Sequence, residues 1–157
     1  MQARMKHPAL VVSGAMPALL GLGSAVTTSA VENGVPQRTL NLAYVRASQI
    51  NGCSVCLAMH ARDAQKEGDT LDRLVAVGAW RESRLFTDAE RAALELTEAM
   101  TRQADRGDTV SDEIWDQVTD YYTDDGIAAL VVAIGMINLW NRLNAATRQV
   151  AQDLVAA

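Results

Sequence analysis

Residues 46–60 read RASQINGCSVCLAMH, and this stretch indicates two consecutive helices separated by a sharp break. Apolar residues recur at helical spacing before Asn51-Gly52, and that dipeptide is a natural interruption. The segment 53–67 contains neither proline nor glycine and is followed by Gly68. It therefore predicts a second helix that carries both cysteines in its first turn. This part of the chain favours an α-helical fold.

Glycine and proline divide the rest of the chain into further helical segments, and no strand-like alternation competes with them. The clearest helix start is Thr87-Asp-Ala-Glu90, which has the spacing of a capping box. The apolar run 126–140 is 15 residues long, shorter than the ~20 needed to span a bilayer, so it predicts a buried core helix. Helices are expected at about 17–32, 36–50, 53–67 and 70–79, after 87, after 111 and from about 126.

The composition predicts one all-α domain over residues 1–157. Of these residues, 49% are hydrophobic but only 4% are aromatic, which favours closely packed helices in a single-domain bundle. The net charge of −5 leaves no basic field for phosphate backbones or anionic membranes. We therefore expect neither nucleic acid nor a membrane as a partner.

The N-terminal region resembles a signal peptide loosely, because Arg4 and Lys6 precede an uncharged run over 9–30. Pro17 is equally suited to the first turn of a helix in the mature protein. We favour the mature helix, expect a cytoplasmic protein, and treat residues 1–15 as a stretch that could be flexible.

Cys53, Cys56 and His60 are the residues on which thiol chemistry would depend. Thiols one helical turn apart interconvert between dithiol and disulfide with little backbone movement. The unpaired N–H groups of a first turn stabilise a thiolate, most strongly at Cys53. His60 is four residues beyond Cys56, where an imidazole can accept the thiol proton. On this basis Cys56 is the better-activated nucleophile, and a redox pair is the favoured interpretation.

The two cysteines have two alternative uses: they could fill a core, or they could form half of a zinc site. A closed zinc site needs four ligands, and besides the two cysteines the chain offers only His60 and the distant His7. We expect no metal and no organic cofactor.

Several motifs together resemble the alkyl hydroperoxidase D / carboxymuconolactone decarboxylase family. The stretch 46–60 is the most specific, and the resemblance covers at least residues 36–148. It continues through Arg62-Asp-Ala64, Trp80-Arg-Glu-Ser, Phe86-Thr-Asp-Ala-Glu-Arg-Ala-Ala-Leu94 and Ile137-Asn-Leu-Trp-Asn-Arg142.

The resemblance implies an all-α homo-oligomer, often a trimer or hexamer, with the two-cysteine helix beside a pocket. In the peroxidase branch the second cysteine attacks a hydroperoxide and the first resolves it into a disulfide, which an external thiol reductant reopens. By position, Cys56 would attack, Cys53 would resolve and His60 would belong to the proton relay. The decarboxylase branch typically lacks this pair, so its presence indicates the thiol branch.

The chain departs from the family pattern at two positions. The relay glutamate, twelve positions before the first cysteine, falls on Asn41, which cannot take up a proton at neutral pH. The histidine that some peroxidase members carry before the second cysteine is replaced by Val55 here.

Other residues could also belong to the site. Tyr44 could donate a hydrogen bond to a bound peroxide, although a core tyrosine is the simpler interpretation. Trp140 and Asn141, with Asn138 and Arg142, could equally line a pocket or anchor an interface.

The leading hypothesis is thus a thiol-dependent peroxidase or disulfide reductase. One alternative is a non-catalytic or vestigial helical oligomer that keeps the thiols without an efficient relay. Another is a decarboxylase or lyase acting on a small organic acid.

Overall fold

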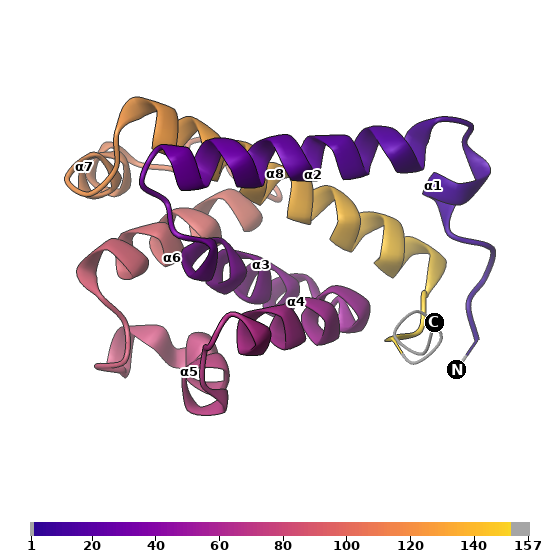
Figure 1. Ribbon diagram of the computed structural model, residues 1–157, viewed down its shortest axis with the longest axis horizontal. Helices are drawn as coiled ribbons and strands as arrows, with labels where there is room; N and C mark the ends of the chain where they lie inside the picture. Colours follow the sequence, from indigo (N-terminus) through magenta and orange to yellow (C-terminus); the bar gives the residue numbers. More distant parts are fainter. Residues whose placement is uncertain (1, 152–157) are drawn as a thin grey trace.

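Helix α3 (Gln37–Asn51) forms the centre of the bundle, because nine of its fifteen residues are buried. It packs against α4 (Ser54–Lys66), α6 (Asp88–Thr101) and α8 (Asp124–Thr147) (Figure 1). The computed structural model describes residues 2–151, and within that range it contains helices and loops but no strand. The predicted all-α fold is confirmed.

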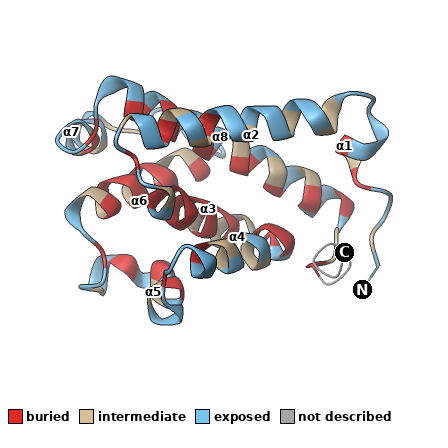
Figure 2. Ribbon diagram, viewed as in Figure 1, coloured by how far each residue is buried: buried red, intermediate tan, exposed pale blue. Residues whose placement is uncertain are grey.

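The remaining helices cover this central group. Helix α2 lies along α8 and leaves much of its outer face exposed (Figure 2). Helix α7 packs mainly on α6, and α5 continues directly into a 3-10 helix, η1. Their bounds are α1 Pro8–Val11, α2 Ala15–Glu32, α5 Leu71–Ala76, η1 Val77–Glu82 and α7 Asp112–Thr119.

The break between α3 and α4 places the cysteines. Gly52 adopts a left-handed conformation with φ 65°, which a residue without Cβ adopts readily, and it ends α3. The next residue, Cys53, donates its N–H to Ser48 O at 3.0 Å and is the N-cap of α4. The chain therefore turns sharply at the predicted position, and α4 packs back against α3.

The capping box at the start of α6 is confirmed: Glu90 N donates to Thr87 Oγ1, and Thr87 N donates to Glu90 Oε2. The last helix is longer than its apolar run suggested. Helix α8 starts at the Thr123 cap and continues past Trp140 for two more turns, to Thr147. Among the described residues, it is the one helix long and apolar enough to cross a membrane by length and composition. Half of its most apolar window is buried in the bundle.

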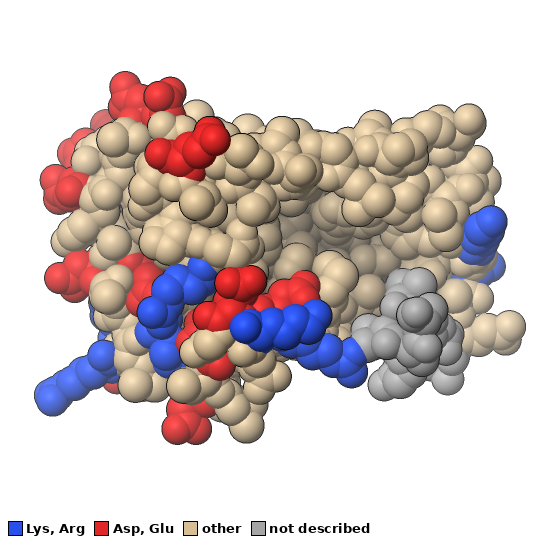
Figure 3. Space-filling view, in the orientation of Figure 1, with Lys and Arg blue, Asp and Glu red and all other residues tan. Residues whose placement is uncertain are grey.

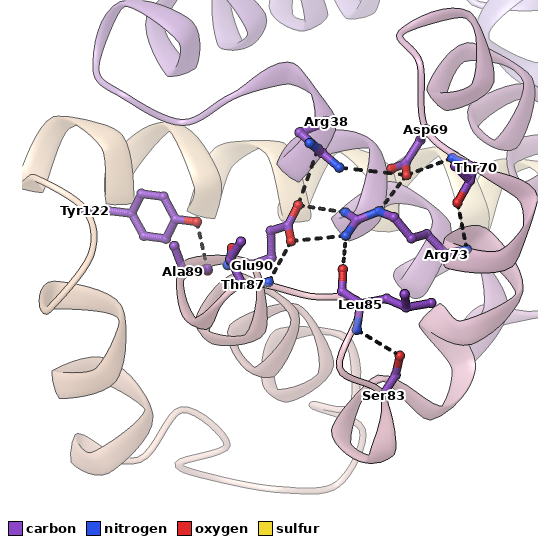
Figure 4. Close-up of polar contacts among 10 residues, drawn as sticks. All are labelled: Arg38, Asp69, Thr70, Arg73, Ser83, Leu85, Thr87, Ala89, Glu90 and Tyr122. Atoms are coloured by element: carbon purple, nitrogen blue, oxygen red, sulfur yellow. Dashed lines mark hydrogen bonds and ion pairs between the residues drawn. The ribbon is translucent and has the colours of Figure 1, made fainter.

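Two buried ion-pair networks hold the α4–α6 region together. In the first, Arg73 bridges Asp69 and Glu90, with N–O distances of 2.6 and 2.7 Å, while the more exposed Arg38 approaches both carboxylates from α3 (Figure 4). Because Glu90 also closes the capping box, this network joins the starts of α3, α5 and α6.

The second network surrounds Glu98 of α6. Its carboxylate accepts hydrogen bonds from Arg46 and from Trp80 Nε1, and also from Arg81 and Arg102. Burial would raise the pKa of Glu98, but these donors outweigh burial and lower its pKa to about 2. Glu98 therefore stays charged and links α3, η1 and α6.

The start of the chain lies against the end of α8. Arg4 N donates to Thr147 O at 2.9 Å, Arg4 Nη1 donates to Ala146 O at 3.1 Å, and Gln149 Nε2 donates to Met5 O at 3.0 Å. The range 1–15, which the sequence left as a stretch that could be flexible, thus includes a docked segment and the short helix α1.

Candidate functional site

The two cysteines lie in the first turn of α4, as predicted, and both are buried free thiols. Cys53 is the N-cap, and its Sγ accepts a hydrogen bond from the Cys56 backbone N–H at 3.4 Å. A helix N-terminus stabilises negative charge on a capping sulfur, so this geometry favours a thiolate at Cys53.

The two thiols face cavities on different sides of α4. Cys56 lines a cavity of about 630 Å³ between α2, α4 and α8, whereas Cys53 lines a second cavity of about 490 Å³ beside the end of α8. Figure 3 shows the molecular surface hollowed between α2 and α4, with few charged side chains over α2. Asn144 lines both cavities and therefore lies between the two openings.

The larger cavity has mostly apolar walls, with polar groups gathered near the Cys56 thiol and at one edge. Asp63, Lys66 and Glu67 mark that edge. Four of the predicted site residues, Asn41, Tyr44, His60 and Trp140, line the cavity together with Cys56. Its apolar surface comes mainly from Leu10, Met16, Leu19, Leu20, Met59, Met136 and Ile137.

Asn144 is a polar side chain in contact with the Cys56 sulfur, and it was not predicted from the sequence. Its Nδ2 donates to Cys56 Sγ at 3.2 Å, while its Oδ1 is buried without a partner. It lies three residues after Asn141 and four after Trp140 on α8, which is the spacing of one helix face. That spacing is the signal by which the sequence could have indicated it.

The two sulfurs ionise as a pair. The hydrogen bond between the Cys56 and Cys53 side chains is the largest influence on Cys53, and it lowers the pKa of Cys53 to about 6 against the opposing effect of burial. The same bond, together with burial and the charge of Cys53, raises the pKa of Cys56. The first negative charge therefore settles mainly on Cys53, while Cys56 is the thiol that faces the larger cavity.

His60 lies on the cavity wall, packed against Tyr44 with their ring centroids 4.7 Å apart. Burial lowers the pKa of His60 to about 4 and outweighs the opposing charge of Asp63, so the imidazole is neutral near pH 7. Tyr44 Oη is buried without a partner, and burial raises the Tyr44 pKa to about 12. The hydroxyl is thus a buried proton donor without a fixed acceptor.

Asn41 also leaves a polar atom unpaired. It is 2% exposed; its Oδ1 accepts from Gln37 Nε2 at 3.1 Å, and its Nδ2 has no partner. The position where the family resemblance places a relay glutamate is therefore on the cavity wall, and a neutral amide occupies it.

Asn141 lies behind the thiols rather than in the larger cavity. Its Nδ2 donates to Ser48 Oγ at 3.2 Å, and its Oδ1 accepts from Asn51 Nδ2 at 2.8 Å. Asn138 accepts from the same Asn51 amide. The two asparagines of α8 thus hold the end of α3, just before the cysteines. Within residues 2–151, no three His, Cys, Asp or Glu side chains group as a metal site would require.

Comparison with known proteins identifies the family. The sequence profile of the carboxymuconolactone decarboxylase family matches residues 14–99, which is more than half of the chain. The chain belongs to the carboxymuconolactone decarboxylase family. The matched range contains Cys53, Cys56 and His60, whereas Asn144 lies beyond it.

Two relatives of this carboxymuconolactone decarboxylase family member are uncharacterized proteins. It is 36% identical over 115 residues to the uncharacterized protein YdfG of Bacillus subtilis, covering 73% of this chain and 77% of that one. It is 32% identical over 114 residues to the uncharacterized protein YnjA of Escherichia coli, covering 73% of this chain and 61% of that one.

Solved structures share the fold. A protein of unknown function from Agrobacterium tumefaciens, for which an antioxidant defence role as AhpD has been suggested, superposes with a TM-score of 0.85 at 32% identity. That match covers 95% of this chain and 97% of the other. The debrominase Bmp8 matches with a TM-score of 0.72 at 21% identity over 85% of this chain and 69% of its own, a likeness of fold.

Proposed function

We propose that this protein is a thiol-dependent peroxidase that reduces hydroperoxides through Cys53 and Cys56. The observation that carries the proposal is the position of Cys56 at the inner wall of the larger cavity, one helical turn from a second free thiol. A hydroperoxide in the cavity would meet Cys56, and the disulfide could then form without unfolding α4. The suggested antioxidant role of the Agrobacterium relative agrees with this proposal.

The proposed reduction of a hydroperoxide has three steps. The Cys56 proton passes to a base, and the thiolate attacks the outer peroxide oxygen; the O–O bond breaks, leaving a sulfenic acid on Cys56 and releasing an alcohol once its oxygen is protonated. Cys53 then attacks the Cys56 sulfur, and water leaves as the disulfide forms. An external dithiol restores both thiols and is itself oxidised to a disulfide.

Two groups can accept the proton of the Cys56 thiol. Neutral His60 lies on the same cavity, although its pKa of about 4 makes it a weak base. Cys53 is the second, because the pair carries its first negative charge there and a proton can shift from Cys56 to Cys53. We propose that the second route supplies most of the reactive Cys56 thiolate.

The cavity walls favour an organic hydroperoxide over hydrogen peroxide. Apolar side chains from α2, α4 and α8 would bury a hydrocarbon group, and each buried methylene contributes about 0.8 kcal/mol. The opening carries Asp63 and Glu67 beside a single lysine, Lys66, so a substrate without negative charge is the better match. We place the activity in the cytoplasm, where thiols are kept reduced.

Turnover in the presence of dithiothreitol tests this function. Reduced protein should consume cumene hydroperoxide faster than hydrogen peroxide, and the variant Cys56→Ser should lose the activity. Consumption no faster than in dithiothreitol alone would instead support a vestigial oligomer that keeps its thiols without using them.

A further inference from the structure

His7 lies inside the protein although it belongs to the first few residues of the chain. The hydrogen bonds of Arg4 and Met5 to the end of α8 bring it there, and only 6% of its surface is exposed. Its ring packs at a tilt against Trp140, with centroids 5.6 Å apart, and it lines the same cavity as Cys56.

The backbone determines which nitrogen of His7 carries the proton. His7 is the N-cap of α1, and its Nδ1 accepts a hydrogen bond from Ala9 N at 3.2 Å. Nδ1 must therefore be unprotonated, so the neutral ring carries its proton on Nε2. Burial lowers the pKa of His7 and keeps the ring neutral near pH 7.

Asn144 lies between His7 and the reactive sulfur. Its Nδ2 donates to Cys56 Sγ, which leaves its buried Oδ1 in need of a donor. The Asn144 side chain is near enough to raise the pKa of His7 against the larger, lowering effect of burial, so the two groups interact. Because Oδ1 is buried and has no hydrogen-bond partner, it can still accept a hydrogen bond from the His7 ring.

We propose that His7 is a positioning residue for Cys56: its Nε2–H donates to Asn144 Oδ1 and keeps the Asn144 amide turned with its N–H toward the sulfur. The orientation matters because the flipped amide would present an oxygen to the thiolate and repel it. Linked hydrogen bonds polarise one another, so His7 also strengthens the bond that Asn144 donates. This inference rests on the proposed function, in which Cys56 reacts as a thiolate.

The test measures the ionisation of Cys56 directly. In a Cys53→Ser background only one thiol remains, and its alkylation by iodoacetamide is followed between about pH 6 and 10. His7→Asn keeps an N-cap acceptor for Ala9 but is too short to reach across to Asn144. The other titratable groups on the cavity are unchanged in this comparison; they are Tyr44, His60, Asp63, Lys66 and Glu67.

We expect His7→Asn to move the midpoint of alkylation to higher pH and to slow alkylation at pH 7 by about three- to tenfold. If His7→Asn only widened the cavity entrance, the plateau rate of alkylation at high pH would change, but the midpoint would stay the same. In an Asn144→Ala background, His7→Asn should have no further effect on the midpoint, because His7 acts on the Cys56 sulfur only through Asn144.

An unchanged midpoint in His7→Asn would overturn the inference, as would an equal shift with and without Asn144. Neither result depends on peroxide turnover, so the proposed function can fail while the inference holds, and the reverse. Thermal unfolding of each variant establishes that the alkylated protein is folded.

Discussion

At the scale of single residues, the thiol that faces the larger cavity is not the more acidic one. Cys56 faces the larger cavity, while hydrogen bonding to Cys53 places the first negative charge there. The sequence indicated both tendencies, since it placed Cys53 nearer the helix terminus and Cys56 nearer the histidine. It gave no sign of how the cavities are distributed, because those depend on where α2 and α8 pack.

The order of attack follows from access to the cavity. Cys56→Ser should abolish hydroperoxide reduction, whereas Cys53→Ser should permit one attack and leave Cys56 as a sulfenic acid. Trapping with dimedone followed by mass spectrometry checks this. If Cys56→Ser instead yields a trapped sulfenic acid on Cys53, the acidity of Cys53 outweighs the access of Cys56, and their roles are exchanged.

Asn41→Glu should raise the rate of attack near neutral pH by up to about a hundredfold, the lower range for a positioned general base. Burial would raise the pKa of the new carboxyl toward neutrality, where it can exchange a proton, and Gln37 can still donate to it. Stopped-flow kinetics measure the rate. Asn41→Gln is the matched control, since it adds the same methylene without an ionisable group.

Unchanged kinetics in a folded Asn41→Glu protein would mean that proton transfer does not limit the reaction. A comparable gain in Asn41→Gln would instead assign the effect to side-chain length. Thermal melting separates both outcomes from simple loss of stability.

At the scale of elements, buried charge holds the helices that carry the site. Arg73 has an almost buried side chain and neutralises Asp69 and Glu90, which are buried themselves. Arg73→Met leaves two buried carboxylates short of a partner and should lower the free energy of unfolding by about 3 kcal/mol. Urea denaturation measures this quantity.

Arg38→Met is the control for that measurement, because Arg38 approaches the same carboxylates with its side chain 52% exposed. It should cost at most about 1 kcal/mol. Equal losses in the two variants would contradict the distinction between buried and exposed partners.

Glu98 should make the fold sensitive to acid. Its pKa falls from an ordinary 4.5 to about 2 in the folded protein, so its contribution is complete above about pH 4.5 and disappears as the pH falls toward 2. Urea denaturation of the wild type and of Glu98→Gln across this range should show a shallower acid dependence in the variant. Glu95→Gln, which removes a more exposed partner of Arg81, should keep the steep dependence.

The helices were largely predictable because their ends are local. The Thr87 capping box and the Asn51-Gly52 break are read from a few neighbouring residues, and both are confirmed. Helix α8 was underestimated because its last turns are polar, and they are stabilised by contacts with Ser48, Asn51 and Cys56 far away in the sequence. Such long-range partners leave no local pattern.

At the scale of the whole molecule, the first described residues pack against the end of α8 beside the site. His7 and Asn144 are 137 positions apart, yet both line the Cys56 cavity. In the sequence His7 is distant from the cysteines, and no spacing rule connects the first residues to the last helix. The family resemblance could be recognised from short motifs, whereas this junction required the folded chain.

The outer face of α2 should mediate self-association. It is almost free of charge, and together with the turn between α1 and α2 it exposes Val12, Leu20 and Val31, each more than half exposed. We therefore expect sedimentation velocity to find an oligomer, a trimer or hexamer by family resemblance, at micromolar concentration. Val31→Asp should weaken it, whereas Val75→Asp, on exposed α5, should not. A monomeric wild type would contradict this prediction.

The most direct test of the peroxidase proposal is a single turnover without reductant. Reduced protein mixed with an equal amount of cumene hydroperoxide should consume all of it and lose two hydrogen atoms by mass spectrometry, with Cys53 and Cys56 joined in one disulfide. Hydroperoxide left intact beside two free thiols would contradict the proposal.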